Sequence, residues 1–350
     1  MAAFLVILLL VCVYGMKIYT LKEFNTGYLS KNNTTAVKGV FVFLVFMSHF
    51  IQYYPVSDAY DTPYKAVRLF LGQLVVVMFL FYSGYGIYES VKKKGSGYIK
   101  SFPVNRFLKT LLHLDIAVLL FVIRNLIMDK PMKLANVLWS FIGWKNIGNS
   151  NWFMFTILIL YFAVYLSFLI FRKKNVWALV LTTVLTIVYV VVMANVIKVA
   201  NYWYNTALCL PLGMWYSFLK DRIEAGVMKN NIIYHITLAA TFGLFMLTHY
   251  NKRPLTVYIF WTLLFCLVVV FVTMKVSFGN KALYWLGNHV FSVYILQRLP
   301  MSVFYEIEPI ASNRYIFFIL SFGVTVILAE LFDRSMAALD KVLFTKKIKK

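Results

Sequence analysis

The chain has 350 residues, of which 61% are hydrophobic, 18% aromatic and only 14% charged, and its mean hydropathy is +0.75. A soluble globular domain carries about 25% charged residues, so this composition excludes one and indicates a polytopic membrane protein. The net charge of +22 does not indicate nucleic acid, because an excess of Lys and Arg on one membrane face explains it. We expect contacts with anionic lipid headgroups and no nucleic-acid partner.

The apolar stretches along the chain predict about eleven transmembrane helices, because a helix needs roughly 20 residues to cross the hydrocarbon core of a bilayer. The stretches cover residues 2–16, 38–54, 69–89, 107–127, 152–171, 176–195, 200–219, 232–249, 255–274, 283–304 and 315–333. In the first of them the charged residue, Lys17, follows the apolar run, whereas a secretory signal has its charges before the run. We therefore expect a retained N-terminal helix and an all-α fold.

The distribution of Lys and Arg predicts the orientation of these helices, because cytoplasmic loops are enriched in basic residues. When the loops are assigned alternately to the two sides, one side holds 24 of the 35 basic residues and the other holds 11. The richer side includes the tail that follows residue 333. The sequence thus places the N-terminus outside and the C-terminus in the cytoplasm.

Three cysteines, Cys12, Cys209 and Cys266, lie within the predicted helices and show none of the spacings of a metal site. We expect neither a disulfide nor a bound metal. The longest connections between helices cover only about residues 17–37, 90–106 and 128–151. Any chemistry must therefore come from the helices and from these short connections.

The second predicted helix carries a cation and an imidazole, Lys38 and His49, at the two ends of KGVFVFLVFMSH. An ionisable side chain inside a bilayer costs roughly 2.5–3.5 kcal/mol on insertion scales and marks a functional site by default. Eleven residues advance an α-helix by about three turns, so both side chains lie on nearly the same face, about 16 Å apart along the axis. This spacing favours a cation that holds a polar cofactor at the membrane surface and a proton-transferring group deeper inside.

A second basic group lies where KKKGSGYIKSFPVNRFLK leads into the fourth predicted helix. Arg106, Lys109 and His113 recur at intervals of three and four residues and therefore share one helix face. Such a cluster beside a Gly–Ser–Gly turn is suited to binding phosphate groups. The alternative is a loop whose basic residues only set the orientation of the helices.

Further polar side chains lie within or at the ends of the predicted helices. They are Ser83 and Tyr85 in FYSGYGI, Asn151 and Trp152 in NSNWF, and Tyr294 and Gln297 in the helix that begins WLGNHVF. Two carboxylates, Asp115 and Glu330, lie inside the fourth and the last predicted helix and are candidates to orient His49 or to pair with a cation. Each residue also has a purely structural interpretation, as a helix-packing contact, an interfacial aromatic residue or a buried ion pair.

Taken in order, these segments resemble the acyltransferase-3 family of integral membrane O-acyltransferases. The resemblance rests on KGVFVFLVFMSHF, FLFYSGYGI, NRFLK, NWFMFTILILY and LGNHVFSVYILQ, and it spans roughly residues 36–333. It implies a membrane domain of about ten helices over 36–334, preceded by an extra helix and cytoplasmic loop over 1–35 and followed by a basic cytoplasmic tail over 335–350. It also implies a bacterial, multi-pass protein of the plasma (inner) membrane.

The resemblance implies that an acyl group, usually acetyl, passes from acetyl-CoA in the cytoplasm to a hydroxyl of a cell-envelope polysaccharide or lipid-linked saccharide. The essential basic residue and histidine of the family fall on Lys38 and His49, and its donor-handling basic pair falls on Arg106 and Lys109. The chain departs from the family in having lysines at Lys38 and Lys109, which lack the planar fork of arginine that binds phosphate through two hydrogen bonds. It also has Gln297 where a histidine is common.

Chemically, His49 is suited to accept the proton of the acceptor hydroxyl as a general base, or to carry the acyl group transiently itself. The main alternative function is a membrane transporter or flippase for a sugar or a polyprenyl-linked saccharide, which buried ionisable residues and many helices suit equally. Against it, the sequence shows no internal repeat and no pair of broken helices in matching halves. A sensor or scaffold without catalysis leaves the placement of Lys38 and His49 unexplained.

Overall fold

The computed structural model describes residues 1–55, 58–172 and 175–344. Within these ranges the regular secondary structure is helical apart from two short strands, β1 (Lys17–Ile18) and β2 (Val276–Ser277), which pair antiparallel. Eight helical segments of the described part are long and apolar enough to cross a membrane. The chain is therefore a polytopic membrane protein, as its composition predicts.

The eight long segments are candidates to cross the membrane. They are α2 (Lys31–Phe50), α4 (Leu74–Lys94), α5 with η2 and α6 (Ser96–Phe102, Pro103–Leu108 and Lys109–Ile127), α8 (Trp152–Ile170), α9 with η3 (Asn175–Val191 and Val192–Val196), α11 (Asn231–Tyr250), α12 (Leu255–Thr273) and α17 (Arg314–Phe344). The shorter elements are α1 (Ala2–Val13), η1 (Ala59–Asp61), α3 (Thr62–Leu71), α7 (Leu134–Ser140), η4 (Asn201–Trp203), α10 (Cys209–Val227), α13 (Lys281–Asn288), α14 (Val290–Leu296), α15 (Arg298–Phe304) and α16 (Glu308–Ala311).

Each of the eleven predicted stretches overlaps a helix, but three of them fall short of a full span. Helix α1 has only 12 residues, and α10 ends in a charged stretch that includes Lys220 and Glu224. The stretch 281–304 is divided into α13, α14 and α15 by breaks at His289 and Gln297. The number of spans and their sidedness thus stay predictions.

Several predicted boundaries are wrong, among them the start of the fourth segment, which lies at Ser96 rather than at residue 107. Helix α2 begins at Lys31 rather than at residue 38. Hydropathy misses its first turns because they are rich in Asn and Thr and are not apolar. The Ser30 hydroxyl caps them by accepting a hydrogen bond from the Asn33 N–H at 3.4 Å. Helix α10 begins at Cys209 rather than at residue 200, and α17 continues to Phe344 rather than ending at 333. The predicted tail is therefore helical as far as Phe344, and its residues 345–350 lie outside the described residues.

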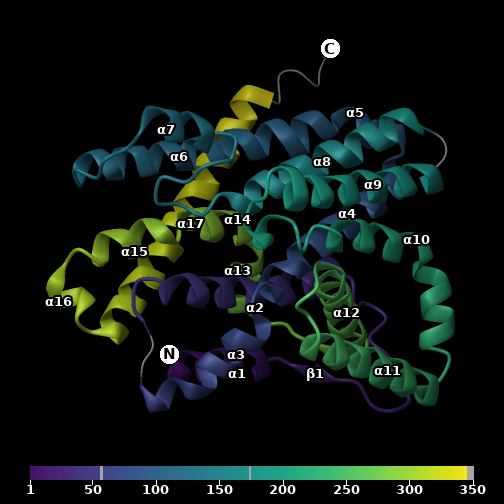
Figure 1. Cartoon of the computed structure of the whole chain (residues 1–350). Helices are drawn as coiled ribbons and strands as arrows, with labels where there is room; N and C mark the ends of the chain where they lie inside the picture. Colours follow the sequence, from purple (N-terminus) through teal and green to yellow (C-terminus); the bar gives the residue numbers. More distant parts are fainter. Residues whose placement is uncertain (56–57, 173–174, 345–350) are drawn as a thin grey trace.

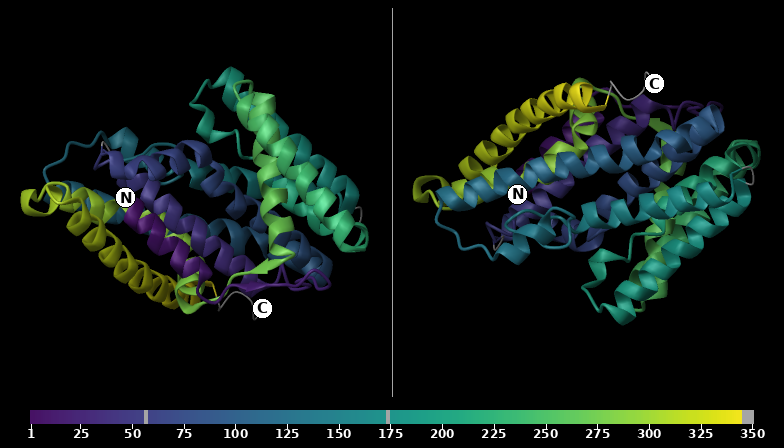
Figure 2. Two further views of the ribbon diagram at one scale, coloured as in Figure 1. Left: turned by 90° about the horizontal axis from the view of Figure 1, so that it is seen from below. Right: turned by 90° about the horizontal axis from the view of Figure 1, so that it is seen from above.

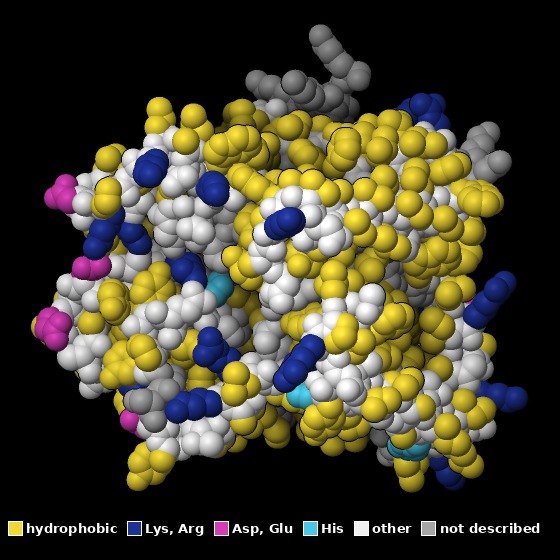
Figure 3. Space-filling model, in the orientation of Figure 1, with side chains coloured by type: hydrophobic (Ala, Val, Ile, Leu, Met, Phe, Trp, Pro, Cys, Tyr) yellow, Lys and Arg dark blue, Asp and Glu magenta, His cyan; other side chains and the backbone are white. Residues whose placement is uncertain are grey.

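Helices α2 and α4 form the centre of the molecule. They are the most buried of the long segments, and in Figure 1 they lie between α5, α6, α8 and α9 above and α1, α3 and α11 below. Figure 2 shows the helices between about residues 175 and 273 grouped along one side. The surface in Figure 3 is largely apolar, with the charged side chains scattered in small groups, as expected of a surface that faces lipid.

Glycines permit the two closest helix contacts at the centre. A Cβ atom at Gly84 of α4 would overlap the Leu210 carbonyl of α10, and one at Gly287 of α13 would overlap the Thr35 carbonyl of α2. Small residues let membrane helices approach in this way. By contrast, Gly86 has no neighbouring atom within 4 Å of such a position, so only one of the two glycines of FYSGYGI serves packing.

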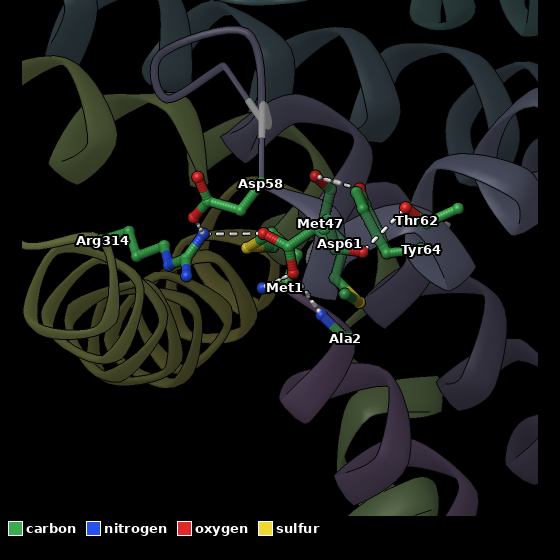
Figure 4. Close-up of polar contacts among 9 residues, drawn as sticks. Met1, Ala2, Met47, Asp58, Asp61, Thr62, Tyr64 and Arg314 are labelled. Atoms are coloured by element: carbon green, nitrogen blue, oxygen red, sulfur yellow. Dashed lines mark hydrogen bonds and ion pairs between the residues drawn. The ribbon is translucent and has the colours of Figure 1, made fainter.

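The helix ends form two opposite poles of the bundle. We call the pole with Lys31, Lys94 and β2 the basic pole, and the pole with Phe50 and Ile127 the far pole. At the far pole the Asp61 carboxylate accepts hydrogen bonds from the Met1 ammonium group at 2.7 Å and from Arg314 at 2.7 Å (Figure 4). Burial alone would raise the pKa of the Asp61 carboxyl, but these hydrogen bonds and charges outweigh it and hold that pKa below its usual range.

Candidate functional site

Two cavities of similar size enter the bundle from its two poles. The first, the basic cavity, has a volume of about 590 Å³ and is lined by Lys38, Arg106 and Lys109. The second, the histidine cavity, has a volume of about 610 Å³ and is lined by His49 and Arg298. Both volumes are typical of sites that bind small molecules and cofactors. Lys38 and His49 share α2 but open into different cavities.

The basic cavity receives its cations from two helices. Lys38 comes from α2, while Arg106 and Lys109 lie where the η2 segment passes into α6. The η2 segment is a π-helical turn that begins at Pro103, because proline lacks the N–H that would continue an α-helical ladder. Such turns widen a helix locally and occur often at functional sites. His113 lines the same cavity one turn further along α6.

Hydrogen bonds hold Arg106 in position at the cavity wall. Its Nε donates to the Tyr98 hydroxyl at 3.2 Å, and its guanidinium lies 5.9 Å from the centroid of the Tyr161 ring. The Tyr161 hydroxyl in turn is 2.9 Å from the Ser83 hydroxyl. Ser83 therefore supports the wall of the basic cavity through Tyr161, and among the described residues no base hydrogen-bonds its hydroxyl to make it a nucleophile.

A carboxylate from the last helix lies among the cations of the basic cavity. Asp340 of α17 pairs with Lys109 at 3.2 Å and with the Nε2 of His113 at 3.2 Å. Within the part of the chain that the structure describes, neither Lys38 nor Arg106 has an acidic partner. The cavity therefore keeps two cations available and holds the third in an internal ion pair.

Aromatic, amide and cationic side chains line the histidine cavity. The amide of Asn151 donates to the carbonyl of Lys145 at 3.0 Å, which fixes the loop before α8 against the cavity. Trp152 lines the cavity as well and packs against Tyr202 at 5.4 Å between ring centroids. On the opposite wall Arg298 donates through Nη2 to the Gln52 side chain. The Nδ1 of His49 is buried and has no hydrogen-bond partner among the described residues.

A thin wall separates the two cavities at mid-depth. Tyr294 of α14 lines both of them, and Phe153 packs against it at 5.5 Å between ring centroids. The Tyr294 ring lies 6.0 Å from the imidazole of His49. The fully buried Gln297 donates its amide to the Tyr294 carbonyl at 3.0 Å and thereby holds the break between α14 and α15. His49 thus lies next to the wall on the side of the histidine cavity.

Three of the other predicted site residues lie away from both cavities. Tyr85 is on the side of α4 that packs against α10, and Asp115 lies half-buried on α6 without an ion-pair partner in the described structure. Glu330 accepts from Trp285 Nε1 at 3.0 Å and from Arg334 at 2.7 Å, and it lies 3.1 Å from His289. Among the described residues neither Asp115 nor Glu330 hydrogen-bonds His49, and Glu330 instead pairs with a cation, Arg334, which is the other role expected for it.

Sequence reasoning missed several residues that line the cavities, among them Tyr82, Arg68, Lys145 and Asp340. Tyr82 could have been predicted as a site residue, because it adjoins Ser83 in the same polar motif. Arg68 and Lys145 lie in connections whose course depends on tertiary packing, and Asp340 lies beyond the predicted end of the last helix. No sequence pattern links these residues to His49 or Lys38.

Comparison with known proteins gives one match. A family model described as an acyltransferase domain, Acyl_transf_3, matches residues 32–333. No curated protein and no solved structure matches the chain. Within the described ranges no three His, Cys, Asp or Glu side chains gather in a way that would hold a metal ion.

Proposed function

The chain belongs to the acyltransferase-3 family of membrane acyltransferases, and we propose that it moves an acetyl group from acetyl-CoA to a hydroxyl of a cell-surface carbohydrate or its lipid-linked precursor. The observation that carries this proposal is the pair of cavities that meet at Tyr294, one with cations for a phosphorylated donor and one with an imidazole for an acceptor. The excess of Lys and Arg at the basic pole supports a cytoplasmic position for the donor cavity and a plasma-membrane location.

The donor proposal assigns the phosphates of acetyl-CoA to Lys38, Arg106 and Lys109. Phosphate oxygens form charge-assisted hydrogen bonds with such groups, and lysine contributes as a point charge where the fork of arginine is missing. Lys109 first has to exchange its contact with Asp340 for one with the donor. The pantetheine arm then extends along the cavity toward Phe153 and Tyr294, with the thioester at the wall.

The chemical step requires only a proton acceptor and correct positioning, because a thioester is already activated. In this proposal His49 accepts the proton of the acceptor hydroxyl. At the same time the oxygen of that hydroxyl attacks the thioester carbonyl carbon. The carbon–sulfur bond then breaks, and the leaving CoA thiolate takes up a proton, which restores neutral His49. General-base catalysis contributes about 10²- to 10⁴-fold. A transient acetyl-His49 that is then attacked by the acceptor uses the same residues.

Transport is the second candidate function, and one observation favours it. The segment 281–304 is interrupted at His289 and Gln297, and interrupted helices at mid-membrane are a feature of many transporters. In this chain the interruption places Tyr294 between the cavities, which serves acyl transfer equally. Membership of an acyltransferase family favours the enzyme over the transporter.

The test is transfer of label from [¹⁴C]acetyl-CoA to envelope carbohydrate of the source organism by the purified protein in lipid nanodiscs. We expect alkali-labile label with the wild type and a loss of at least about 100-fold with His49→Ala. His235→Ala is the matched control, because His235 is exposed on α11 and lines neither cavity. Transfer at the wild-type rate by His49→Ala would remove His49 from the mechanism, and sugar transport without any labelling would establish the transporter.

A further inference from the structure

The histidine cavity has an unbalanced charge. Three cations, Arg68, Lys145 and Arg298, line it, and no Asp or Glu is among its described lining residues. At pH 7 the cavity therefore presents a positive potential, which low-dielectric walls strengthen. A neutral sugar gives no reason for this charge.

These cations also have no acidic partner within the described ranges. Three carboxylates of the far pole are already paired elsewhere, since Asp58 and Asp61 contact Arg314, and Glu306 contacts Lys130. Arg298 makes one hydrogen bond, to Gln52, while its Nε is buried without a partner. A buried donor without an acceptor is costly, so an anionic group in the cavity would relieve it.

The other lining groups suit a saccharide. Asn149, Asn151 and Gln73 offer amides, and Trp144 and Trp152 offer aromatic faces. Amide groups hydrogen-bond hydroxyls in both directions, and aromatic rings pack against the apolar faces of sugar rings. We propose that the acceptor is an anionic saccharide, one that carries a carboxylate or a phosphate close to the hydroxyl that is acylated. This inference rests on the proposed function, because it assigns the class of acceptor to the same cavity.

The cationic lining continues beyond the histidine cavity. Asn146 lines this cavity and also a neighbouring one of about 570 Å³, whose walls include Arg124, Lys130 and Lys133. Arg124 is held by hydrogen bonds to Asn125 and Ser302, and Lys130 pairs with Glu306, so Lys133 is the cation of this second cavity whose side chain has neither a hydrogen-bond nor an ion-pair partner in the described structure. A track of cations over two adjoining cavities fits a chain of anionic repeats better than a single sugar.

The experiment measures binding of defined oligosaccharides to the full chain in nanodiscs of zwitterionic lipid. The probes are a neutral galactose trimer, the same trimer with one phosphate monoester, a galacturonate trimer and a galacturonate hexamer. We expect at least one anionic trimer to bind about 10-fold or more tightly than the neutral one, with an advantage that shrinks as salt rises. The two anionic trimers distinguish a phosphate from a carboxylate as the recognised group.

Substitutions of the lining cations test which of them cause the preference for anionic trimers. The double variant Arg68→Gln, Lys145→Gln should weaken binding of the anionic trimer about 10-fold and leave binding of the neutral trimer unchanged. Arg253→Gln is the matched control, because Arg253 is exposed at the same pole and lines none of these cavities. The hexamer should bind more tightly than the trimer, and Lys133→Gln should remove only this difference. Equal binding of neutral and anionic trimers, no binding of either anionic trimer, or an equal loss with Arg253→Gln would overturn the inference.

Acetyl-CoA binding separates this inference from the proposed function. Normal acetyl-CoA binding and transfer together with no preference for anionic trimers would refute the inference alone. A clear preference for anionic trimers in a protein that binds no acetyl-CoA would refute the acyltransferase mechanism and support the inference about the cavity.

Discussion

The imidazole of His49 and the ring of Tyr294 lie 6.0 Å apart between centroids, at the wall between the two cavities. In the proposed mechanism, this position lets Lys38 and His49, on one helix, serve two substrates that arrive from opposite poles. Lys38 lies with the cations of the donor cavity, and His49 lies with the amides and aromatic rings of the acceptor cavity. In the proposed mechanism, the wall keeps the thioester away from water in the histidine cavity until a hydroxyl is in place.

The wall predicts a leak when its central ring is removed. Tyr294→Ala should raise hydrolysis of acetyl-CoA without acceptor several-fold and lower transfer to carbohydrate, because water then reaches the thioester from the histidine cavity. Release of free CoA, followed with a thiol reagent, measures it. Tyr294→Phe keeps the ring, so its cleavage of acetyl-CoA should stay coupled to transfer, as in the wild type. If Tyr294→Ala hydrolyses no faster than the wild type, the ring does not separate the substrates.

The ion pair of Asp340 with Lys109 predicts that this carboxylate competes with the donor phosphates. Asp340→Asn should bind acetyl-CoA about 5-fold more tightly, since about 1 kcal/mol is the typical upper value for a partly exposed ion pair. Titration calorimetry in nanodiscs measures the change. Asp333→Asn is the control on the same helix, because Asp333 contacts Ser292 and His289 and lines neither cavity. Weaker binding by Asp340→Asn would show that Asp340 instead positions Lys109.

The close contact of α13 with α2 predicts a stability effect. Gly287→Ala places a methyl group against the Thr35 carbonyl and should destabilise the protein by about 1–3 kcal/mol, the usual range for overpacking. Gly86→Ala should be neutral, because nothing lies within 4 Å of its Cβ position. Thermal unfolding in the same detergent compares the two variants. An equal midpoint for both would mean that the helices do not approach at Gly287.

The contacts of Asp61 predict a loss of stability in acid. A carboxyl whose folded pKa is held below its unfolded value stabilises the fold above the unfolded pKa, which is about 3.9, and this contribution is lost as the pH falls through the folded value. The unfolding midpoint of the wild type should therefore fall more between pH 5 and pH 3 than that of Asp61→Asn. Asp129→Asn, at an exposed residue, should behave like the wild type. Parallel curves for the wild type and Asp61→Asn would contradict the shift.

Hydropathy was sufficient to find the helices but not their ends. The eleven apolar stretches all overlap helices, because the hydrophobic requirement of a bilayer is strong and local. The start of α2 depends on the Ser30 cap, and the start of α10 depends on a loop packed against the bundle. The end of α17 depends on charged residues where this helix leaves the apolar region. The cap and the loop packing leave no trace in a hydropathy average, and the charged residues lower that average although the helix continues through them.

The candidate site was predictable in part for the same reason. Spacing along α6 predicted one shared face for Arg106, Lys109 and His113, and all three line the basic cavity. Spacing along α2 predicted nearly the same face for Lys38 and His49, and this stays a prediction. Spacing did not reveal that Lys38 and His49 belong to different cavities, since Tyr294 and Phe153 form the wall from other helices. The pairing of Asp340 with Lys109 likewise joins residues more than 200 positions apart, beyond the reach of any local pattern.

The most direct test of the central claim is titration of acetyl-CoA into the protein in lipid nanodiscs, with the wild type, Arg106→Ala, His49→Ala and the exposed control Arg222→Ala. The account predicts saturable binding that Arg106→Ala weakens about 10-fold or more, and that His49→Ala and Arg222→Ala leave unchanged. Binding that disappears in His49→Ala to the same degree as in Arg106→Ala, or no saturable binding by the wild type, would contradict the division of donor and acceptor between the two cavities.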